Sequence, residues 1–249
     1  MGHAVVFVCI ALIWEFGGKL VAPEMLPPLT SVLLRIVEAL YEKTALSHIE
    51  STLWKTVLSF ALGSVAGILL GLVAGWFRLV DSFLQPLIYS TYSLPRVALI
   101  PLFVLWLGLG NKTVVVVAAV AVFYIVLINT INGVKQIDPV LIRAARNLGA
   151  NDLQLMTKVL LPAAAVPIFA AIRLGVGQAL ISVISGEILI GDSGLGYWIW
   201  NARYRMDTTL VFVNLVLLAL LGYFITLIAR AMEKVINRWQ RNASEELWV

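Results

Sequence analysis

"DPVLIRAARNLGANDLQLMTKVLLP", residues 138–162, lies between two long apolar runs and is polar and basic where its flanks are not. Asp138 followed by Pro139 favours a helix start, because the Asp side chain accepts from free amides and proline tolerates the first helical position. Gly149 then predicts a left-handed C-cap. Asn151 predicts the cap of a second helix that runs to Pro162. We therefore expect two short helices joined at a glycine corner, outside the lipid.

The first of these helices is predicted to be amphipathic. Arg143 and Arg146 lie away from its apolar face. Because isolated helices this short are marginal in water, something must hold it in place. Two interpretations stay open from periodicity alone: insertion into a groove on a partner protein, or an ordinary surface loop that packs on its own bundle. The apolar face consists of Val140, Leu141, Ala144, Ala145 and Leu148.

The composition predicts an integral membrane protein. Hydrophobic residues make up 61% of the chain and charged residues only 13%, and the mean hydropathy is +0.94. A soluble domain carries about 25% charged residues. Several apolar runs reach the ~20 residues that a helix needs to cross a bilayer. These runs are continuous, whereas barrel strands alternate, so the expected fold class is an all-α integral membrane protein.

The scarcity of cysteine and histidine excludes two kinds of chemistry. With one cysteine, Cys9, an intrachain disulfide is impossible, and with only His3 and His48 as histidines no metal site is expected. We attribute the net charge of +4 to membrane topology rather than to nucleic-acid binding, so no nucleic acid is expected as a partner.

Six transmembrane helices are predicted, of which the third is short. Placing the amino terminus in the cytoplasm puts the larger share of Lys and Arg on the cytoplasmic side, so both termini are expected there. Between the first two spans, Pro27 and Pro28 precede an amphipathic pattern of Val32, Ile36, Val37 and Leu40, which predicts a helix along the membrane surface. The six spans are Ala4–Val21, Leu53–Trp76, Val97–Leu109, Val114–Val134, Ala163–Ile190 and Leu210–Ala231.

Small residues recur at every fourth position of the second span. Such a stripe lets another helix approach closely in lipid. Packing within one subunit is favoured over a dimer seam, and the stripe indicates a compact bundle rather than a function. It consists of Gly63, Gly67, Gly71 and Gly75.

The opening segment resembles the EAA loop of ABC-importer permeases, whose pattern is Glu-Ala-Ala, three residues, Gly, nine residues, then Ile-x-Leu-Pro. Arg143 stands where the pattern has Glu, and Val159 replaces Ile. In having arginine at this first position, the sequence is similar to the subfamily that carries nitrate, taurine, alkanesulfonates and some vitamin precursors. "SLPRVALIPLFVLWLGLGNKT" and "GEILIGDSGLGYWIWNARYRMDTTLV" also look like signatures of that subfamily. The loop positions that match are Ala144, Ala145, Gly149, Leu161 and Pro162.

The resemblance implies a type I importer fold in a bacterial inner membrane. It implies a homodimer of permeases, two ATP-binding subunits that hold ATP and Mg, and an external or periplasmic solute-binding protein, with no cofactor on this chain. Residues 1–52 would hold the first span and the external segment, and residues 53–249 the permease core with its EAA-type loop at 138–162. The helix from Pro139 would be the coupling helix, touching the ATPase through Arg143, Ala144, Ala145, Arg146, Leu148, Gly149, Ala150 and Asn151.

The sequence offers one independent support for a separate ATPase. It contains no G-x-x-x-x-G-K-[ST] phosphate loop; the nearest string, "EFGGKL", lacks both the spacing and the hydroxyl residue. If transport is driven by ATP, another chain must hydrolyse it.

Polar residues inside predicted spans are candidates for the substrate path, because charges in lipid are costly. Glu187 is either a polar lining of the path or a helix-end glutamate bonded to a neighbour. Arg173 either attracts an anion or pairs at the bundle edge. Pro95 and Pro101 predict a helix break, which lipid-embedded chains tolerate beside protein or water. The path candidates are Tyr92, Ser93, Pro95, Arg173, Ser182, Ser185 and Glu187.

Two other function classes remain alternatives. A secondary carrier would also place polar groups near the midplane and could show internal repeats, but the two halves of this sequence show no convincing repeat, and a carrier needs no cytoplasmic helix pair. An intramembrane enzyme needs a nucleophile and base or a metal pair, and these spans contain none. The sequence therefore predicts an ATP-driven permease subunit for a small polar or anionic solute, which is not itself an enzyme.

Overall fold

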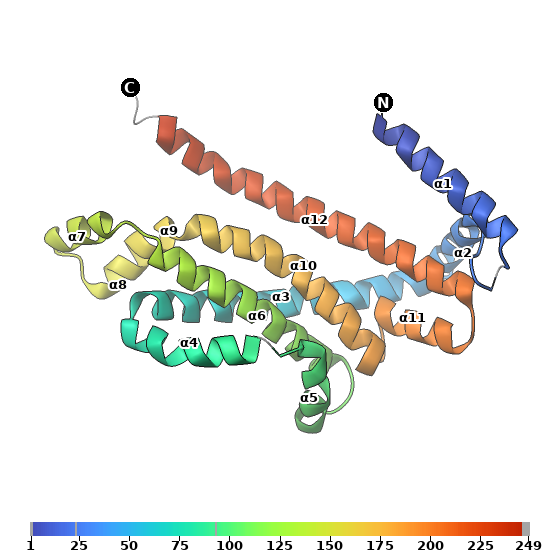
Figure 1. Ribbon diagram of the computed structural model, residues 1–249, viewed down its shortest axis with the longest axis horizontal. Coiled ribbons are helices and arrows are strands. Elements are labelled where there is room, and N and C mark those ends of the chain that lie inside the picture. Colours follow the sequence, from blue (N-terminus) through green and yellow to red (C-terminus); the bar gives the residue numbers. More distant parts are fainter. Residues whose placement is uncertain (1, 23, 93, 246–249) are drawn as a thin grey trace.

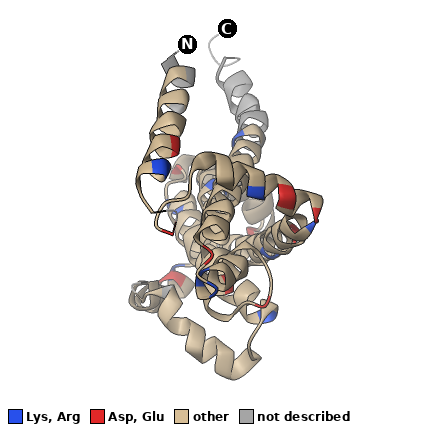
Figure 2. Cartoon of the chain, turned by 90° about the vertical axis from the view of Figure 1, so that its right-hand side faces the viewer, with Lys and Arg blue, Asp and Glu red and all other residues tan. Residues whose placement is uncertain are grey.

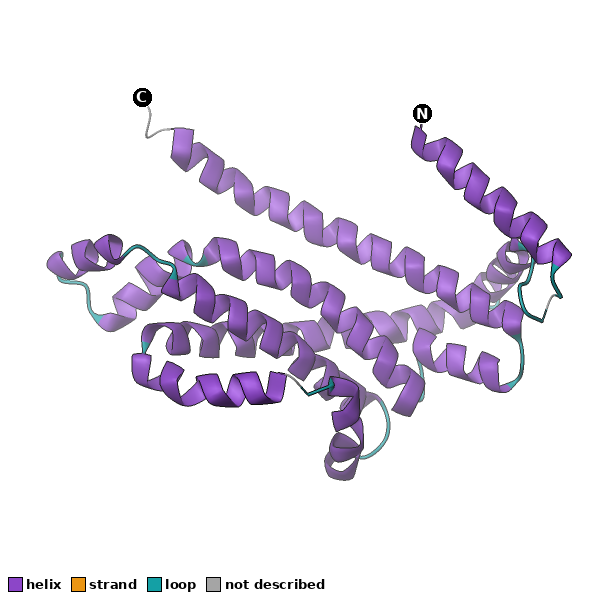
Figure 3. Cartoon of the chain, in the orientation of Figure 1, coloured by secondary structure: helices purple, strands orange, loops and turns teal. Residues whose placement is uncertain are grey.

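The computed structural model describes residues 2–22, 24–92 and 94–245, and every regular element within these ranges is helical (Figure 3). The order along the chain is α1 (Gly2–Leu20), α2 (Leu29–Tyr41), α3 (Thr44–Trp76), α4 (Arg78–Tyr92), the 3₁₀ helix η1 (Arg96–Leu99), α5 (Ile100–Leu107), α6 (Asn111–Lys135), α7 (Pro139–Asn147), α8 (Asp152–Gln154), the π-helix η2 (Leu155–Leu160), α9 (Leu161–Ala163), α10 (Ala165–Ile190), α11 (Leu195–Tyr204) and α12 (Thr208–Glu245).

Four helical segments among the described residues are long and apolar enough to cross a membrane. They confirm the predicted second, fourth, fifth and sixth spans. Helix α1 coincides with the predicted first span but is not one of the four; with the bent pair of α4 and α5 counted as one broken span, the described residues hold up to five of the predicted six. Figure 2 shows how sparse charged residues are along these helices. The four segments are Thr44–Trp76, Asn111–Lys135, Ala165–Tyr204, which joins α10 to α11, and Thr208–Ala231.

The predicted third span, Val97–Leu109, corresponds to the second arm of a bent helix pair, and the helix break predicted around Pro95 is confirmed. Helix α5 has only 8 residues, roughly 12 Å of helix, which cannot cross a hydrocarbon core of about 30 Å. It joins α4, which the sequence analysis did not predict, in a pair bent by 92°. The break lies at Pro95, in extended backbone with φ −60° and ψ 116°, because the residue before a proline and the proline itself both disfavour a continuing helix.

The centre of the bundle is formed by α3, α6 and α10, which lie side by side (Figure 1). The glycine stripe of α3 faces α6. A Cβ added at Gly63 would lie 2.4 Å from the Ala119 carbonyl oxygen, and one at Gly71 would lie 2.6 Å from Thr130 Cβ. Such distances leave no room for a methyl group, so the stripe sets how closely the two backbones approach. Packing within one subunit, the favoured interpretation, is confirmed.

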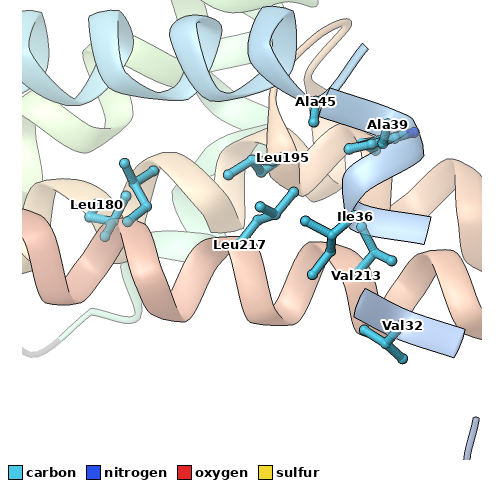
Figure 4. Packing of buried hydrophobic residues seen from close by; sticks show 10 residues of the cluster. Val32, Ile36, Ala39, Ala45, Leu180, Leu195, Val213 and Leu217 are labelled. Carbon is cyan, nitrogen blue, oxygen red and sulfur yellow. The ribbon is translucent and has the colours of Figure 1, made fainter. Parts of the chain in front are cut away.

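Helix α2 docks on the bundle rather than resting only on lipid. Its Val32 and Ile36 are buried in a cluster with Val213 and Leu217 of α12 (Figure 4). Val37, which the sequence analysis placed on the same apolar face, is 65% exposed. The predicted amphipathic helix therefore exists, but its most buried stripe packs on protein, because α12 offers an apolar surface at that end of the bundle.

Candidate functional site

The helix α7 and the corner after it have the local geometry expected from their sequence. Asp138 Oδ1 accepts a hydrogen bond from the Val140 amide over 2.8 Å, and Pro139 is the first helical residue. The helix ends with Gly149 at φ +83°, where its amide donates to the Arg146 carbonyl over 2.9 Å. The Ala150 amide donates to the Ala145 carbonyl. The predicted cap, start and left-handed corner are all confirmed.

The second half of the loop departs from a regular α-helix. Asn151 and Gln154 form a reciprocal capping box, with bonds of 2.8 and 3.0 Å. The following turn, Leu155–Leu160, is a π-helix, which leads through α9 directly into α10. The expected second α-helix ending at Pro162 is therefore only partly correct. Turns of this kind recur at functional sites in helices, and the sequence carried no signal for it.

Helix α7 lies at one end of the bundle (Figure 1), and its apolar side chains are exposed. Val140 and Leu141 are 56% and 52% exposed, and Leu148 is 89% exposed. No residue of α7 is buried. Ile142 alone of this helix packs against the cluster of buried residues that includes Leu160. One edge thus anchors α7 to its own bundle, while the face with Ala144 is left for another surface.

The two arginines of α7 differ in their surroundings. Arg146 forms an ion pair with Asp152 across the glycine corner, and its guanidinium lies 6.0 Å from the ring centroid of Trp76. These contacts connect α7 to α8 and to the end of α3. Arg143, one turn earlier on the helix, is also exposed. The coupling candidates Ala150 and Asn151 continue the same exposed corner.

A second candidate region is a groove beside the bent pair. It consists of two adjoining pockets of about 430 and 220 Å³, which share Gln178 and Ile181. Five predicted path residues line it: Tyr92, Pro95, Arg173, Ser182 and Ser185. The predicted Ser93 lies outside the described residues.

Sequence analysis missed two polar residues of this groove, Asn129 of α6 and Gln178 of α10. Gln178 could have been found from its spacing, since Gln178, Ser182 and Ser185 follow the three-and-four-residue rhythm of one helix face. Asn129 gave no such signal, because nothing in the sequence states which face of α6 lies toward α10.

Glu187 does not line this groove but is fully buried in an ion pair. Lys55 Nζ lies 2.7 Å from Glu187 Oε1 and donates a second bond to the Ser193 carbonyl over 2.7 Å. The Thr52 hydroxyl lies 3.0 and 3.1 Å from the two carboxylate oxygens. The Gly196 amide donates to Glu187 Oε2 over 3.0 Å. Of its two interpretations, the bonded helix-end glutamate describes this conformation.

The loop between α10 and α11 is held by the same network. The Leu195 amide donates to the Thr52 hydroxyl over 2.9 Å, and the Gly194 amide donates to His48 Nδ1 over 3.2 Å. Gly194 has φ +105°, and a Cβ there would lie 2.0 Å from Glu187 Oε1. Only glycine allows the loop to close over the carboxylate, which explains the Gly-Leu-Gly string physically.

Within the described ranges, no group of three or more His, Cys, Asp or Glu side chains could hold a metal ion. The arrangement contains an exposed helical corner, a polar groove beside a broken helix, and a buried ion pair that fixes the opposite end of α10.

Comparisons with known proteins agree with these features. Residues 63–241 match the family described as "Binding-protein-dependent transport system inner membrane component". The chain is 31% identical over 238 residues to the putative aliphatic sulfonates transport permease protein SsuC of Bacillus subtilis, covering 95% of this chain and 86% of that one. It is 27% identical over 226 residues to the taurine transport system permease protein TauC of Escherichia coli, covering 89% and 82%.

A solved structure shows the same fold. It is an inward-facing conformation of the MetNI methionine ABC transporter, with a TM-score of 0.67 and 23% sequence identity, over 77% of this chain and 95% of that one.

Proposed function

The chain belongs to the family of binding-protein-dependent transport system inner membrane components, which makes it a permease subunit of an ABC importer, and we propose how this subunit is assembled and used. It is a multi-pass membrane protein and a transport subunit rather than an enzyme, since ATP is hydrolysed on a separate chain in this family. The proposed assembly is a homodimer of this chain with two ATP-binding subunits and an external solute-binding protein.

The observation that carries the proposal is the exposed corner at α7. A capped helix with half-exposed Val140 and Leu141 has no buried residue of its own. An ATPase subunit that receives this face would supply the missing contacts, as amphipathic helices dock in grooves. ATP and Mg would be held by that partner, and none of the chemistry would fall on this chain.

Only a few side-chain contacts separate α7 from the membrane-spanning helix α10. Arg146 pairs with Asp152 across the corner, and Ile142 packs on the buried cluster that contains Leu160 and Ile168 of α10. Movement of α7 with the ATPase would therefore be passed to α10 as rigid-body motion. Alternating access would follow if two such units rock against each other.

A second copy is proposed because the groove is open. Its lining comes from α4, the 95–100 segment, α6 and α10, and a path through the membrane must be enclosed on all sides from lipid. Closed two-fold pairs are the commonest homo-oligomers. A two-fold axis beside the groove would place the polar walls of both copies toward one path.

The orientation follows from the docking of α7. A cytoplasmic ATPase requires the α7 end to face the cytoplasm, and Arg78, Lys135 and Lys158 gather at that end in agreement with the positive-inside rule. Both termini are then cytoplasmic, in the inner membrane of a bacterium. The network around Glu187 lies at the outer end, where the solute-binding protein would dock.

The proposed solute is small and polar or anionic. Relatives named for aliphatic sulfonates and for taurine support a sulfonate; nitrate or a vitamin precursor is the alternative from the wider subfamily. Which of these is carried is set mainly by the binding protein.

The experiment is purification of the tagged chain from its native cells in a mild detergent, with mass spectrometry of everything that stays bound. An ATP-binding protein at near-equal stoichiometry is the expected result. A homo-oligomer without an ATPase, reproduced in several detergents, would contradict the proposal and favour the alternative, a secondary carrier.

A further inference from the structure

The groove beside the bent pair contains hydrogen-bonding groups that its own structure uses only in part. Asn129 Nδ2 donates to the Ile125 carbonyl over 2.8 Å, and Gln178 Nε2 donates to the Ser182 hydroxyl over 2.9 Å. A primary amide has a second N–H and a carbonyl oxygen beyond one such bond. These groups lie at the wall of the groove, where a solute can reach them.

Arg173 gives the groove a charged side chain. Among the described residues that line either pocket there is no Asp or Glu. Arg173 also interacts within the chain. A cation beside apolar walls attracts anions more strongly than it would in water.

The groove also lies at membrane depth. Arg173 is roughly 12 Å along α10 from Ala165, and Ser185 is roughly 18 Å further on, at 1.5 Å per residue. The polar wall thus covers more than half of a hydrocarbon core of about 30 Å. Tyr92, Pro95 and Val97, which lie on either side of the break in the bent pair, line the same groove, which is the setting in which irregular backbone is tolerated within membranes.

We propose that Arg173, Asn129 and Gln178 form a binding site for a small organic oxyanion, a sulfonate or carboxylate, as it passes through the groove. This inference rests on the proposed function and adds the residues through which the permease itself contacts the solute. The guanidinium sets the sign of charge, and the two amides donate to the oxyanion while Ser182 and Ser185 continue the polar wall. The depth favours a dissolved solute over a lipid phosphate, because headgroups stay at the membrane surface.

The test measures charge selectivity without knowing the natural solute. Because Cys9 is the only cysteine, a Cys9→Ser chain provides a background in which Ser182→Cys is the sole thiol. The assembled importer in native membranes is treated with two methanethiosulfonate reagents of similar size, one ending in a sulfonate and one in a trimethylammonium. Ser47→Cys, at the exposed start of α3, gives the intrinsic rate ratio of the reagents outside the groove.

The sulfonate-to-ammonium rate ratio at Ser182→Cys is expected to exceed that at Ser47→Cys by roughly ten-fold, the lower end of the enrichment produced by charged clefts. Adding Arg173→Gln should remove this preference, and Arg173→Lys should keep it. An equal ratio at the two positions, a ratio unchanged by Arg173→Gln, or no modification of Ser182→Cys in any nucleotide state would overturn the proposal.

Two further measurements distinguish a dissolved oxyanion from a lipid headgroup as the ligand of this site. Millimolar methanesulfonate should slow the reaction at Ser182→Cys, whereas a change from phosphatidylcholine to phosphatidylglycerol vesicles should not. Protection by phosphatidylglycerol alone would assign the site to a lipid headgroup and overturn the solute assignment. ATPase co-purified from the same membranes reports on the proposed function separately, since it depends on α7 and not on the groove.

Discussion

Lys55 of α3 and Glu187 of α10 form an ion pair with Nζ and Oε1 2.7 Å apart, and neither side chain is exposed. The pair joins two spans at the end of the molecule opposite α7. Its remaining bonds go to the loop that precedes α11, so one buried contact holds three segments together.

Single substitutions of this pair should be far more damaging than the double substitution. Lys55→Met or Glu187→Met alone leaves a buried charge without its partner, which costs about 3–5 kcal/mol. The double variant removes both charges and should recover most of that stability. Thermal unfolding in detergent checks this, with the exposed pair Arg35 and Glu38 as a control whose loss costs about 1 kcal/mol or less. A double variant no more stable than either single one would refute the argument.

Because the glycine stripe of α3 packs closely against α6, a larger residue in place of one of these glycines should destabilise the protein. Gly71→Ala places a Cβ 2.6 Å from Thr130 Cβ, and such overpacking should cost about 1–3 kcal/mol. Gly222→Ala in α12 is the matched control, because its Cβ would lie 3.5 Å from Leu180 Cδ2, an ordinary contact. Thermostability of the two variants should differ accordingly; equal stability would mean that α3 and α6 are not packed this closely.

The corner at Gly149 should be sensitive to conformation and not to size. A Cβ there meets nothing within 4 Å, but φ is +83°, which costs a β-branched residue about 1–2 kcal/mol. Gly149→Val should weaken ATPase association by roughly ten-fold, the equivalent of about 1.4 kcal/mol, whereas Gly149→Asn should retain it because asparagine tolerates this backbone. The measurement is the amount of ATPase retained per permease at unchanged membrane levels.

Ala145→Glu tests the face of α7 directly. The substitution places a carboxylate on the side of the helix proposed to meet the ATPase, with little effect on the bundle because Ala145 is only partly buried. Hydrolysis should become uncoupled from transport, or the ATPase should be lost. Normal solute uptake by this variant would show that α7 does not couple the permease to the ATPase.

The docking of helix α2 should depend on the side chains that it buries against α12. Ile36→Ala removes a side chain packed beside Val213 and Leu217 and should cost about 2–5 kcal/mol. Val37→Ala, at an exposed neighbour on the same helix, should cost little. Similar losses in both variants would indicate that the membrane surface, and not α12, holds this helix.

Features encoded locally were predictable from the sequence. Asp138, Pro139 and Gly149 determine the ends of α7 through bonds within a few residues. The glycines of α3 lie on one face because residues four apart lie on the same side of a helix. The third span was predicted incompletely because its apolar run, Val97–Leu109, contains only the second arm of the bent pair; the first arm is α4, on the other side of Pro95.

Features that depend on tertiary packing were not predictable. Lys55 and Glu187 are 132 residues apart, and no local pattern connects them. Asn129 belongs to the groove only because α6 turns that face toward α10. The π-helix at Leu155–Leu160 likewise has no local signal, since its residues are compatible with an ordinary helix.

The most direct test of the account is a contact between α7 and an ATPase subunit. Leu148→Cys in the Cys9→Ser chain places a thiol on the exposed corner, where a benzophenone maleimide can be attached and photoactivated in native membranes. The account predicts an adduct between the permease and an ATP-binding protein from Leu148→Cys and none from Ser47→Cys at the opposite end. No such adduct from Leu148→Cys, or equal adducts from both positions, would contradict it.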